Sequence, residues 1–387
     1  MADVVIVGAG VMGSSIAFQL ARRDAGRVVV VDRAGVGQGM SGRSSALVRM
    51  HYAFRPEVEL AVASLRLFDA WPDFVGAPSV LRRTGFVRFV RPGEEAHLRA
   101  NVAMQQACGA EVEIVADEAL TRLLPDWHLE SGEVAAYEPH GAYGDGARVA
   151  GDFLARARQL GAEYRPGVNA VGLRTEKGRV IGVDTQGGPI EATIVVVAAG
   201  PWTPELLTGI GVHVPITGDL HEIAIVHHPN GPPRARLACI DSATQTYHRP
   251  DGEQTTLVGT FAGRLWSDPD HFPQQPTVDS LGAMVEAAAR RLPALAVGGI
   301  ARGYTGIYDM TPDARALIGV LPEAPGVCLA AGFSGTGFKL SPAVGVVVAE
   351  LLLDGRATTV DISAFRPDRF QRNEPIQPLF EYADALG

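Results

Sequence analysis

Three glycines near the start of the chain have the spacing of a nucleotide-binding turn. Gly8, Gly10 and Gly13 form a Gly-x-Gly-x-x-Gly pattern directly after a short apolar run. The first glycine permits a tight turn, the second lets the backbone approach a pyrophosphate, and the third lets the next helix pack on the strand. The amino end of that helix, at Val11 and Met12, would present free N–H groups to the anion.

An acidic residue completes this pattern. Asp32 follows the apolar run Val28–Val31, 19 residues after Gly13, where a carboxylate can accept hydrogen bonds from ribose hydroxyls. A strand–helix turn without a cofactor would leave Asp32 unexplained. The strand–helix–strand unit therefore predicts dinucleotide binding, although the pattern alone does not choose between NAD and FAD.

A second glycine-rich turn lies near the end of the chain. Gly332, Gly335 and Gly337 separate the apolar run Val327–Ala331 from a helix that we predict over Ser341–Leu353. Glycines at these places let backbone N–H groups approach a flat, electron-accepting ring, and the positive end of the helix would stabilise the negative charge of its reduced form. A plain strand-to-helix connection is the alternative.

Only two of the 34 basic residues are lysines, Lys177 and Lys339. A compact ammonium on a flexible stem fits places where a planar guanidinium does not. Lys339, next to the second glycine-rich turn, is therefore a candidate for binding an anionic group, with a surface lysine at a helix start as the alternative. Lys177 is expected to be a solvated residue of a Lys-Gly turn.

Composition excludes several classes of protein. The 387 residues are 47% hydrophobic and 20% charged, which indicates a globular chain of more than one domain. A net charge of −9 argues against nucleic-acid binding, and no apolar run is long enough to span a membrane. The start, MADVVIVGAG, has no basic segment of the secretory kind, so we expect a cytoplasmic protein. Cys108, Cys239 and Cys328 lack metal-site spacing, so no metal is expected.

Several stretches spread over nearly the whole chain resemble the D-amino-acid-oxidase-like superfamily of FAD enzymes, in the branch with sarcosine oxidases, glycine oxidase and dimethylglycine dehydrogenase. They are the first glycine turn, Ser41–Ser45 with Arg49, Val195–Trp202, Gly306–Asp313 and Ala330–Pro342. The resemblance implies an α/β fold in which a Rossmann-like FAD-binding domain of the GR2 type is interleaved with an antiparallel β-sheet substrate domain.

The expected domain boundaries follow the alternation of patterns along the chain. The FAD-binding domain would comprise 1–80, 145–215 and 311–370, the substrate-binding domain 81–144 and 216–310, and a C-terminal tail 371–387. By resemblance, the FAD-binding residues are Gly8, Gly10, Val11, Met12, Gly13, Asp32, Arg33, Ser41, Arg43, Ser44, Ser45, Val168, Ala199, Gly200, Trp202, Gly306, Gly332, Phe333, Ser334, Gly335, Thr336, Gly337, Phe338 and Lys339.

The resemblance also implies roles at the reacting centre. Lys339 matches a lysine that binds the substrate carboxylate, and Arg49 matches an arginine that assists it. Tyr308 matches an active-site tyrosine, and Tyr247 is similar to a second one from the substrate domain. His51 is a candidate to take or relay a proton, although a lone histidine is more often a structural residue.

Two departures from the family pattern bear on the chemistry. Gly306 stands where the sarcosine-oxidase branch has a cysteine bonded to flavin, and Arg43–Ser45 lacks the histidine of the dehydrogenases, so we predict non-covalent FAD. No lysine lies between Lys177 and Lys339, so the lysine that speeds the reaction with oxygen in monomeric sarcosine oxidases is absent.

The implied reaction is oxidation of the C–N bond of an amino acid, or of an N-alkyl or cyclic amino acid. Hydride would pass to flavin N5 and leave an imine that hydrolyses, with O2 or another molecule as electron acceptor. The open alternatives are a dehydrogenase with a quinone or protein acceptor, the FAD subunit of a larger amine-oxidising complex, and an NAD(P)-dependent dehydrogenase. The sequence does not indicate an oligomeric state.

Overall fold

The computed structural model describes residues 1–382, and residues 383–387 of the predicted C-terminal tail lie outside the described part. In this part of the chain, one sheet has eight strands, in the order β10-β11-β12-β1-β2-β9, with β20 beside β12 and β19 beside β20. Its strands are β1 (Ala2–Val7), β2 (Val28–Asp32), β9 (Glu163–Pro166), β10 (Ala170–Glu176), β11 (Arg179–Thr185), β12 (Ile190–Val197), β19 (Leu317–Val320) and β20 (Val327–Ala331).

Five of these strands, β1, β2, β9, β12 and β20, are parallel and end at the same edge of the sheet. Val7 at the end of β1 pairs in register with Val31 of β2 and with Val197 of β12, and Val197 pairs with Leu329 of β20. Ligands of open α/β sheets bind beyond the carboxyl ends of the strands. The register therefore places both glycine-rich turns at the edge where a cofactor is expected.

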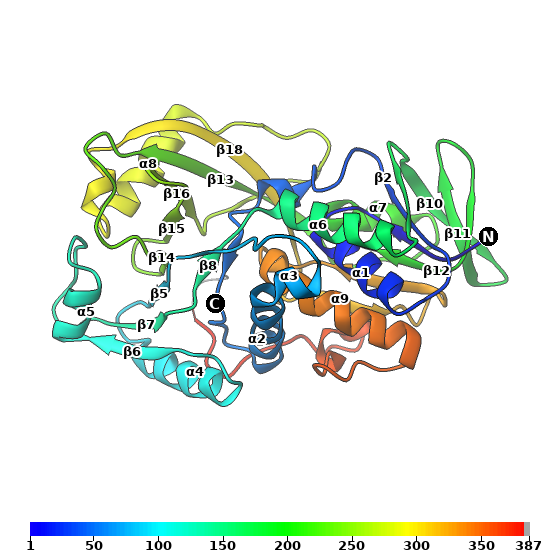
Figure 1. Cartoon of the computed structure of the whole chain (residues 1–387), viewed down its shortest axis with the longest axis horizontal. Coiled ribbons are helices and arrows are strands. Elements are labelled where there is room, and N and C mark those ends of the chain that lie inside the picture. Colours follow the sequence, from blue (N-terminus) through cyan, green and yellow to red (C-terminus); the bar gives the residue numbers. More distant parts are fainter. Residues whose placement is uncertain (383–387) are drawn as a thin grey trace.

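Helices cover this sheet on one side. They are α1 (Val11–Arg22), α2 (Arg55–Asp69), α3 (Trp71–Phe74), α6 (Gly146–Gln159) and α9 (Gly337–Asp354), while α7 (Thr203–Thr208) lies on the other side. Helix α1 packs between α6 and α9, and α2 packs on α9 (Figure 1).

Alternate residues of the central strands enter two separate cores. Ile6 and Val196 belong to the core beneath α1, α6 and α9, whereas Val5 and Val197 belong to the core shared with α7 and the β10–β11 hairpin. Both faces of the strands are therefore buried, which explains why the sequence shows continuous apolar runs there rather than alternation.

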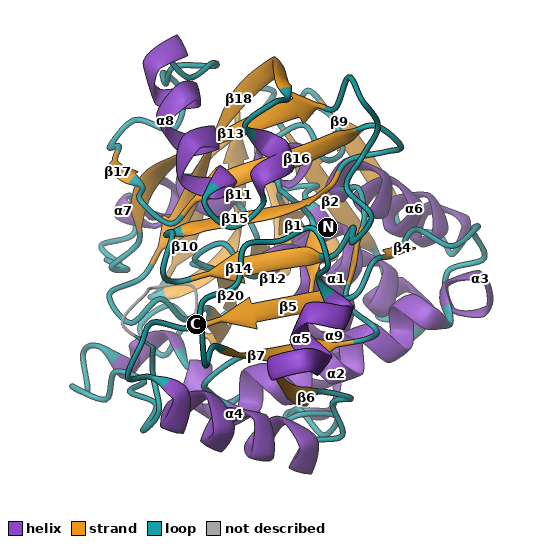
Figure 2. Ribbon diagram, turned by 90° about the vertical axis from the view of Figure 1, so that its left-hand side faces the viewer, coloured by secondary structure: helices purple, strands orange, loops and turns teal. Residues whose placement is uncertain are grey.

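A second sheet has nine strands in the described residues, and all neighbours are antiparallel except β14 and β5. Its strands are β5 (Phe86–Phe89), β6 (Glu113–Ala116), β7 (Val134–Glu138), β13 (Thr217–His227), β14 (Ala238–Asp241), β15 (Thr246–Pro250), β16 (Thr255–Thr260), β17 (Arg264–Leu265) and β18 (Gly299–Met310). Figure 2 shows β15, β14, β5 and β7 side by side. Helices α4 (Glu95–Ala107), α5 (Asp117–Leu123) and α8 (Val278–Ala289) flank it.

Short elements connect the two sheets. A three-stranded sheet is formed by β3 (Leu47–Val48), β8 (Ala142–Tyr143) and β4 (Arg82–Arg83), and the 3-10 turns are η1 (Met40–Arg43), η2 (Gly200–Trp202), η3 (Pro293–Leu295), η4 (Ser363–Phe365) and η5 (Pro367–Arg369).

The predicted α/β class is confirmed. All strands of the first sheet fall in 1–80, 145–215 and 311–370, and all strands of the second in 81–144 and 216–310, so we propose these boundaries for the two domains.

The last helix begins earlier than the sequence predicts. The predicted start was Ser341, but α9 begins at Gly337 and contains Pro342. Proline has no N–H to give to the carbonyl of Phe338, four residues before it. The hydroxyl of Ser341 donates a hydrogen bond to that carbonyl instead, at 2.8 Å, and the helix continues through the proline.

No helix among residues 1–382 is both long and apolar enough to cross a membrane. Within the same residues, no cluster of three or more His, Cys, Asp or Glu side chains could hold a metal ion.

The contact between α1 and α9 gives a prediction about stability. A Cβ added at Gly345 would lie 2.9 Å from the backbone oxygen of Ser15, whereas a Cβ at Gly151 of α6 would meet nothing within 4 Å. We expect Gly345→Ala to lower the free energy of unfolding by about 1–3 kcal/mol through overpacking. The matched Gly151→Ala should raise it by roughly 0.5–1 kcal/mol. Urea unfolding of both variants would test this, and equal effects would contradict it.

Candidate active site

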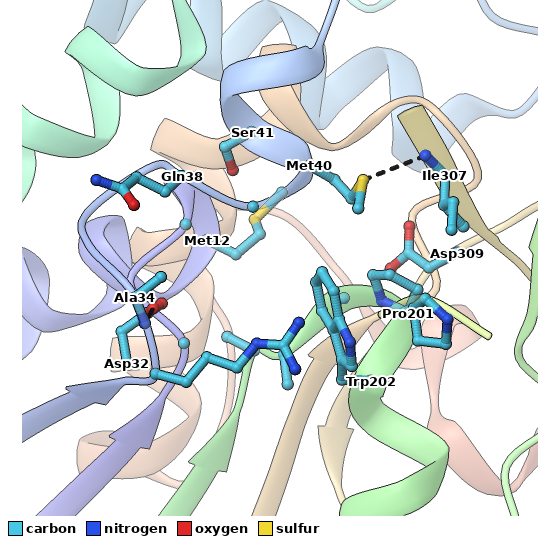
Figure 3. Close-up of a pocket in the computed structure, with 18 of the residues that line it drawn as sticks. Met12, Asp32, Ala34, Gln38, Met40, Ser41, Pro201, Trp202, Ile307 and Asp309 are labelled. Carbon is cyan, nitrogen blue, oxygen red and sulfur yellow. Dashed lines mark hydrogen bonds between the residues drawn. The ribbon is translucent and has the colours of Figure 1, made fainter. Parts of the chain in front are cut away.

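A cavity opens at the carboxyl ends of β1, β2, β12 and β20 and extends toward β18 (Figure 3). Most of the residues expected to bind the cofactor line it. They are Gly8, Gly10, Val11, Met12, Asp32, Arg33, Ser41, Arg43, Ser44, Val168, Ala199, Gly200, Trp202, Gly306, Phe333, Gly335, Gly337 and Phe338. Tyr308 lines it as well.

Close backbone contacts explain the first glycine turn. Gly8 has φ +109°, and a Cβ there would lie 3.0 Å from the carbonyl carbon of Ala198, at the end of β12. A Cβ at Gly13 would lie 3.0 Å from the carbonyl carbon of Gly8. Gly13 is not among the residues that line the cavity. Its lack of a side chain lets α1 lie against β1, as its place in the pattern predicts.

Asp32 holds the turn from the neighbouring strand. Its Oδ2 accepts a hydrogen bond from the backbone N–H of Ala9 at 2.7 Å, and its Oδ1 accepts one from Ala34 at 2.8 Å. Asp32 and Ala34 lie at one end of the cavity in Figure 3. Each carboxylate oxygen has a further lone pair that can accept a hydroxyl, so this position suits a ribose.

The loop from Gly35 to Ser45, called the early loop, is hydrogen-bonded both to helix α1 on the first sheet and to strand β18 of the second sheet. Ser41 Oγ accepts the backbone N–H of Val11 at 3.0 Å, at the start of α1. Farther along the loop, Arg43 donates to the carbonyl of Thr305 at 2.9 Å. A Cβ at Gly306 would lie 3.3 Å from the Cβ of Arg43, so glycine at this position permits the close approach of β18 to the loop.

One rim of the cavity is formed by Arg33, Trp202 and Asp270, of which only Asp270 was not expected from the sequence. The guanidinium carbon of Arg33 lies 4.3 Å from the ring centroid of Trp202, and both side chains bond to Asp270, at 2.5 and 2.8 Å. Asp270 lies in a polar loop without a recognisable motif, so only its position in space reveals its role.

Asp309 organises the second glycine turn. Its Oδ2 accepts the backbone N–H of Gly332 at 2.7 Å, and its carbonyl accepts that of Ser334 at 3.1 Å. The Thr336 hydroxyl donates to the carbonyl of Phe333 at 2.7 Å. Gly332, Ser334 and Thr336 therefore shape the turn from behind the lining, whereas Phe333 faces the cavity.

Burial raises the pKa of the Asp309 carboxyl to about 6. Asp309 lies within the family-like stretch Gly306–Asp313, and its carboxylate is the only feature of the sequence that indicates a role for it.

The amino end of α9 faces the same cavity as the amino end of α1. Its N-cap residue, Thr336, makes no side-chain cap, and Gly337 and Phe338 of the first turn line the cavity. Uncapped N–H groups and the helix dipole make this region electropositive. The amino ends of α1 and α9 therefore both face one elongated cavity, each at a different part of it.

Tyr308 is fixed by stacking. Its ring centroid lies 3.9 Å from that of His221, whose Nε2 lies 3.1 Å from Asp219. Burial raises the pKa of Tyr308 and of Tyr247. The Tyr308 hydroxyl raises the pKa of Tyr247 further, whereas the Tyr247 hydroxyl opposes the rise at Tyr308. Tyr247 therefore lies beside Tyr308, one layer behind the lining. No motif in the sequence pointed to His221.

Arg49 and Lys339 are brought together in the interior, outside the cavity lining. The Arg49 guanidinium carbon lies 4.3 Å and the Lys339 ammonium 5.8 Å from the ring centroid of Tyr52. Burial lowers the pKa of Lys339 well below its usual value, Arg49 lowers it further, and Glu57 opposes the change. Glu57 itself forms an ion pair with Arg315 at 2.8 Å.

His51 is not brought to the cavity. Its Nε2 lies 2.8 Å from the Tyr382 hydroxyl, and burial lowers the pKa of its imidazole well below the usual value. The carbonyl of Ser45, another residue outside the lining, accepts a hydrogen bond from Arg249 at 2.5 Å. Both residues contribute to the junction between the sheets.

The hydrogen bonds of Asp32 give a prediction about cofactor binding. Asp32→Asn replaces one acceptor oxygen with a donor NH2 facing a backbone N–H, so the turn should loosen. We expect the dissociation constant for FAD to rise about 10- to 100-fold, because charge-assisted hydrogen bonds are lost. Quenching of flavin fluorescence during titration would measure it. The exposed Asp24→Asn is the control, and equal affinity of the two variants would contradict the assignment.

Comparisons with known proteins agree with this geometry. A family model described as FAD dependent oxidoreductase matches residues 3–351. The chain is 26% identical over 420 residues to FAD-dependent oxidoreductase domain-containing protein 1 of Xenopus laevis, covering 97% of this chain and 84% of that protein. It is 26% identical over 376 residues to glycine oxidase of Geobacillus kaustophilus, covering 94% and 96%.

Among solved structures, L-proline dehydrogenase from P. horikoshii superposes with a TM-score of 0.89 at 25% identity, covering 97% of this chain and 99% of that one. The predicted cofactor, FAD, is confirmed by the family match. Because that match spans most of the sequence and the cavity is built as a dinucleotide site requires, the chain belongs to the family of FAD-dependent oxidoreductases.

Proposed function

We propose that this oxidoreductase oxidises the C–N bond of an amino acid, or of an N-alkyl or cyclic amino acid. The observation that carries the proposal is the buried pair of cations, Arg49 and Lys339, of which Lys339 directly follows the lining residue Phe338. Two buried cations with a shared aromatic neighbour suit a carboxylate, the group common to these substrates.

The residues present fit FAD. The turn from Gly8 to Gly13 and the start of α1 would hold the pyrophosphate, Asp32 the ribose, and the turn from Gly332 to Gly337 the ring. FAD, when bound, supplies an electron sink that accepts hydride from the carbon next to the substrate nitrogen, leaving an imine that water hydrolyses. We propose that it is held without a covalent bond, because Gly306 offers no nucleophile.

The protein contributes orientation and charge. Arg49 and Lys339 would fix the carboxylate, and their positive charge would lower the pKa of the substrate ammonium, favouring the neutral amine that can be oxidised. Tyr308 and Tyr247, whose pKa values are raised by burial, keep their protons at neutral pH. They would therefore donate hydrogen bonds rather than act as bases.

The second candidate is a dehydrogenase that passes electrons to a quinone or a protein. The absence of any lysine between Lys177 and Lys339 favours it over an oxidase. The name of the P. horikoshii relative, L-proline dehydrogenase, is consistent with such an acceptor in this fold.

A substrate screen tests the proposal directly. Purified, FAD-loaded protein is offered proline, sarcosine, glycine and larger amino acids with an artificial electron acceptor, while peroxide release under air is followed in parallel. Turnover with an amino acid supports the proposal, and peroxide separates an oxidase from a dehydrogenase. Protein that takes up FAD but oxidises none of these substrates with either acceptor would contradict the proposal.

The only two lysines provide a matched pair of variants. Lys339→Met should raise KM by about 10- to 100-fold, because one charge-assisted contact to the carboxylate is lost, and it should leave the visible FAD spectrum intact. Lys177→Met, in the exposed β10–β11 turn, should leave both unchanged. Unaltered kinetics in Lys339→Met would contradict the proposal that Lys339 binds the substrate carboxylate.

The shifted pKa of Lys339 predicts a pH dependence. Its ammonium is charged below the lowered pKa and neutral above it, so carboxylate binding weakens as pH rises through that value. We expect kcat/KM to fall as pH rises, with a midpoint below the ordinary lysine value of about 10.4. The fall should be missing from the Lys339→Met profile. A fall of the same midpoint and size in that variant would assign it to another group.

A further inference from the structure

A second cavity, of about 950 Å³, lies on the other side of the early loop from the cofactor cavity. Five arginines line it, one each from η1, β4, α6, β15 and β18: Arg43, Arg82, Arg148, Arg249 and Arg302. We call it the arginine pocket. In a chain with a net charge of −9, this concentration of positive charge is a local exception.

The two carboxylates in the wall are already bonded. Asp251 pairs with Arg249 at 2.9 Å. Asp145 is the N-cap of α6, and its Oδ1 accepts the backbone N–H of Arg148 at 2.9 Å. Each of these acids is therefore engaged with its own neighbour.

Three arginines of the pocket have no carboxylate partner among residues 1–382. The Arg43 guanidinium donates to the carbonyl of Thr305 and to the amide of Gln274, both neutral groups. Arg82 and Arg302 are exposed, and the guanidinium carbon of Arg302 lies 5.9 Å from the ring centroid of Tyr304. Like charges facing one cavity repel each other, so an anion bound among them would be stabilised.

Other groups of the wall also suit an anion. Gly146 and Ala147, at the amino end of α6, line the pocket, and the positive end of a helix favours negative charge. The Tyr143 ring supports the Arg249 guanidinium at 4.3 Å, and its hydroxyl accepts the backbone N–H of Gly252 at 3.2 Å. These contacts hold the wall in place without using the unpaired arginines.

We propose that the arginine pocket binds a small polyanion that carries phosphate or carboxylate groups. The guanidinium fork matches both groups in a bidentate manner. The site is separate from the one that would hold the amino acid, but Gln38, Arg43 and Ser44 line both cavities. A bound anion would therefore touch the far side of the loop that covers the cofactor.

Calorimetric titration of the FAD-loaded full chain tests the proposal. FAD occupies the pyrophosphate-binding turn, so added inorganic pyrophosphate reports on the arginine pocket. Citrate would also suit Arg49 and Lys339, so its binding is assigned to the pocket only where the charge variants below weaken it. At low ionic strength we expect one site, with an affinity that falls as NaCl is added. Binding of pyrophosphate alone would assign a phosphate ligand, and binding of citrate alone a carboxylate ligand. Failure of both to bind at millimolar concentration would overturn the proposal.

Charge variants locate the site. Arg82→Glu with Arg302→Glu should weaken binding at least about 10-fold, because two charged contacts are reversed. Arg179→Glu with Arg356→Glu, two exposed arginines elsewhere, should have no effect. Arg82→Gln with Arg302→Gln serves if the reversed pair does not fold, as judged by its FAD spectrum and melting. Equal binding by the pocket variants and the wild type would refute the assignment, whether or not the protein oxidises amino acids.

Discussion

The parallel pairing of β1, β12 and β20 is the constraint on which the site depends. These strands come from the beginning, the middle and the end of the chain, and their register brings Val7, Val197 and Leu329 to one level of the sheet. Each strand ends in a turn rich in small residues, and the three turns meet at the same edge. A site for a long cofactor forms there because parallel strands present all their carboxyl ends together.

The early loop connects the two sheets at the cofactor cavity. It contacts α1 through Ser41 and β18 through Arg43, and it separates the cofactor cavity from the arginine pocket. Gly306 serves this contact, since a larger residue would press on Arg43. In the proposed non-covalent mode of FAD binding, the same glycine would leave no side chain to bond the flavin, so one small residue would have both a packing and a chemical consequence.

The buried charges of Lys339 and Arg49 would link folding to the proposed function. Lys339 and Arg49 lie in a region that disfavours two positive charges, and Glu57, held by Arg315, offsets part of that cost. A substrate carboxylate would offset the rest. Asp309 also has two roles. Its carboxylate accepts a hydrogen bond from the second glycine turn, and the same residue lines the cavity.

The sequence by itself determined the parts that depend on local patterns. Continuous apolar runs identified the buried parallel strands, glycine spacing identified both turns, and the scarcity of lysine drew attention to Lys339. The start of α9 was misplaced, because the Ser341 hydroxyl compensates for Pro342 only in the folded helix. His221, Asp270 and the arginine pocket were decided by tertiary structure alone: their residues lie far apart along the chain, carry no shared spacing, and meet only when the two sheets pack against each other.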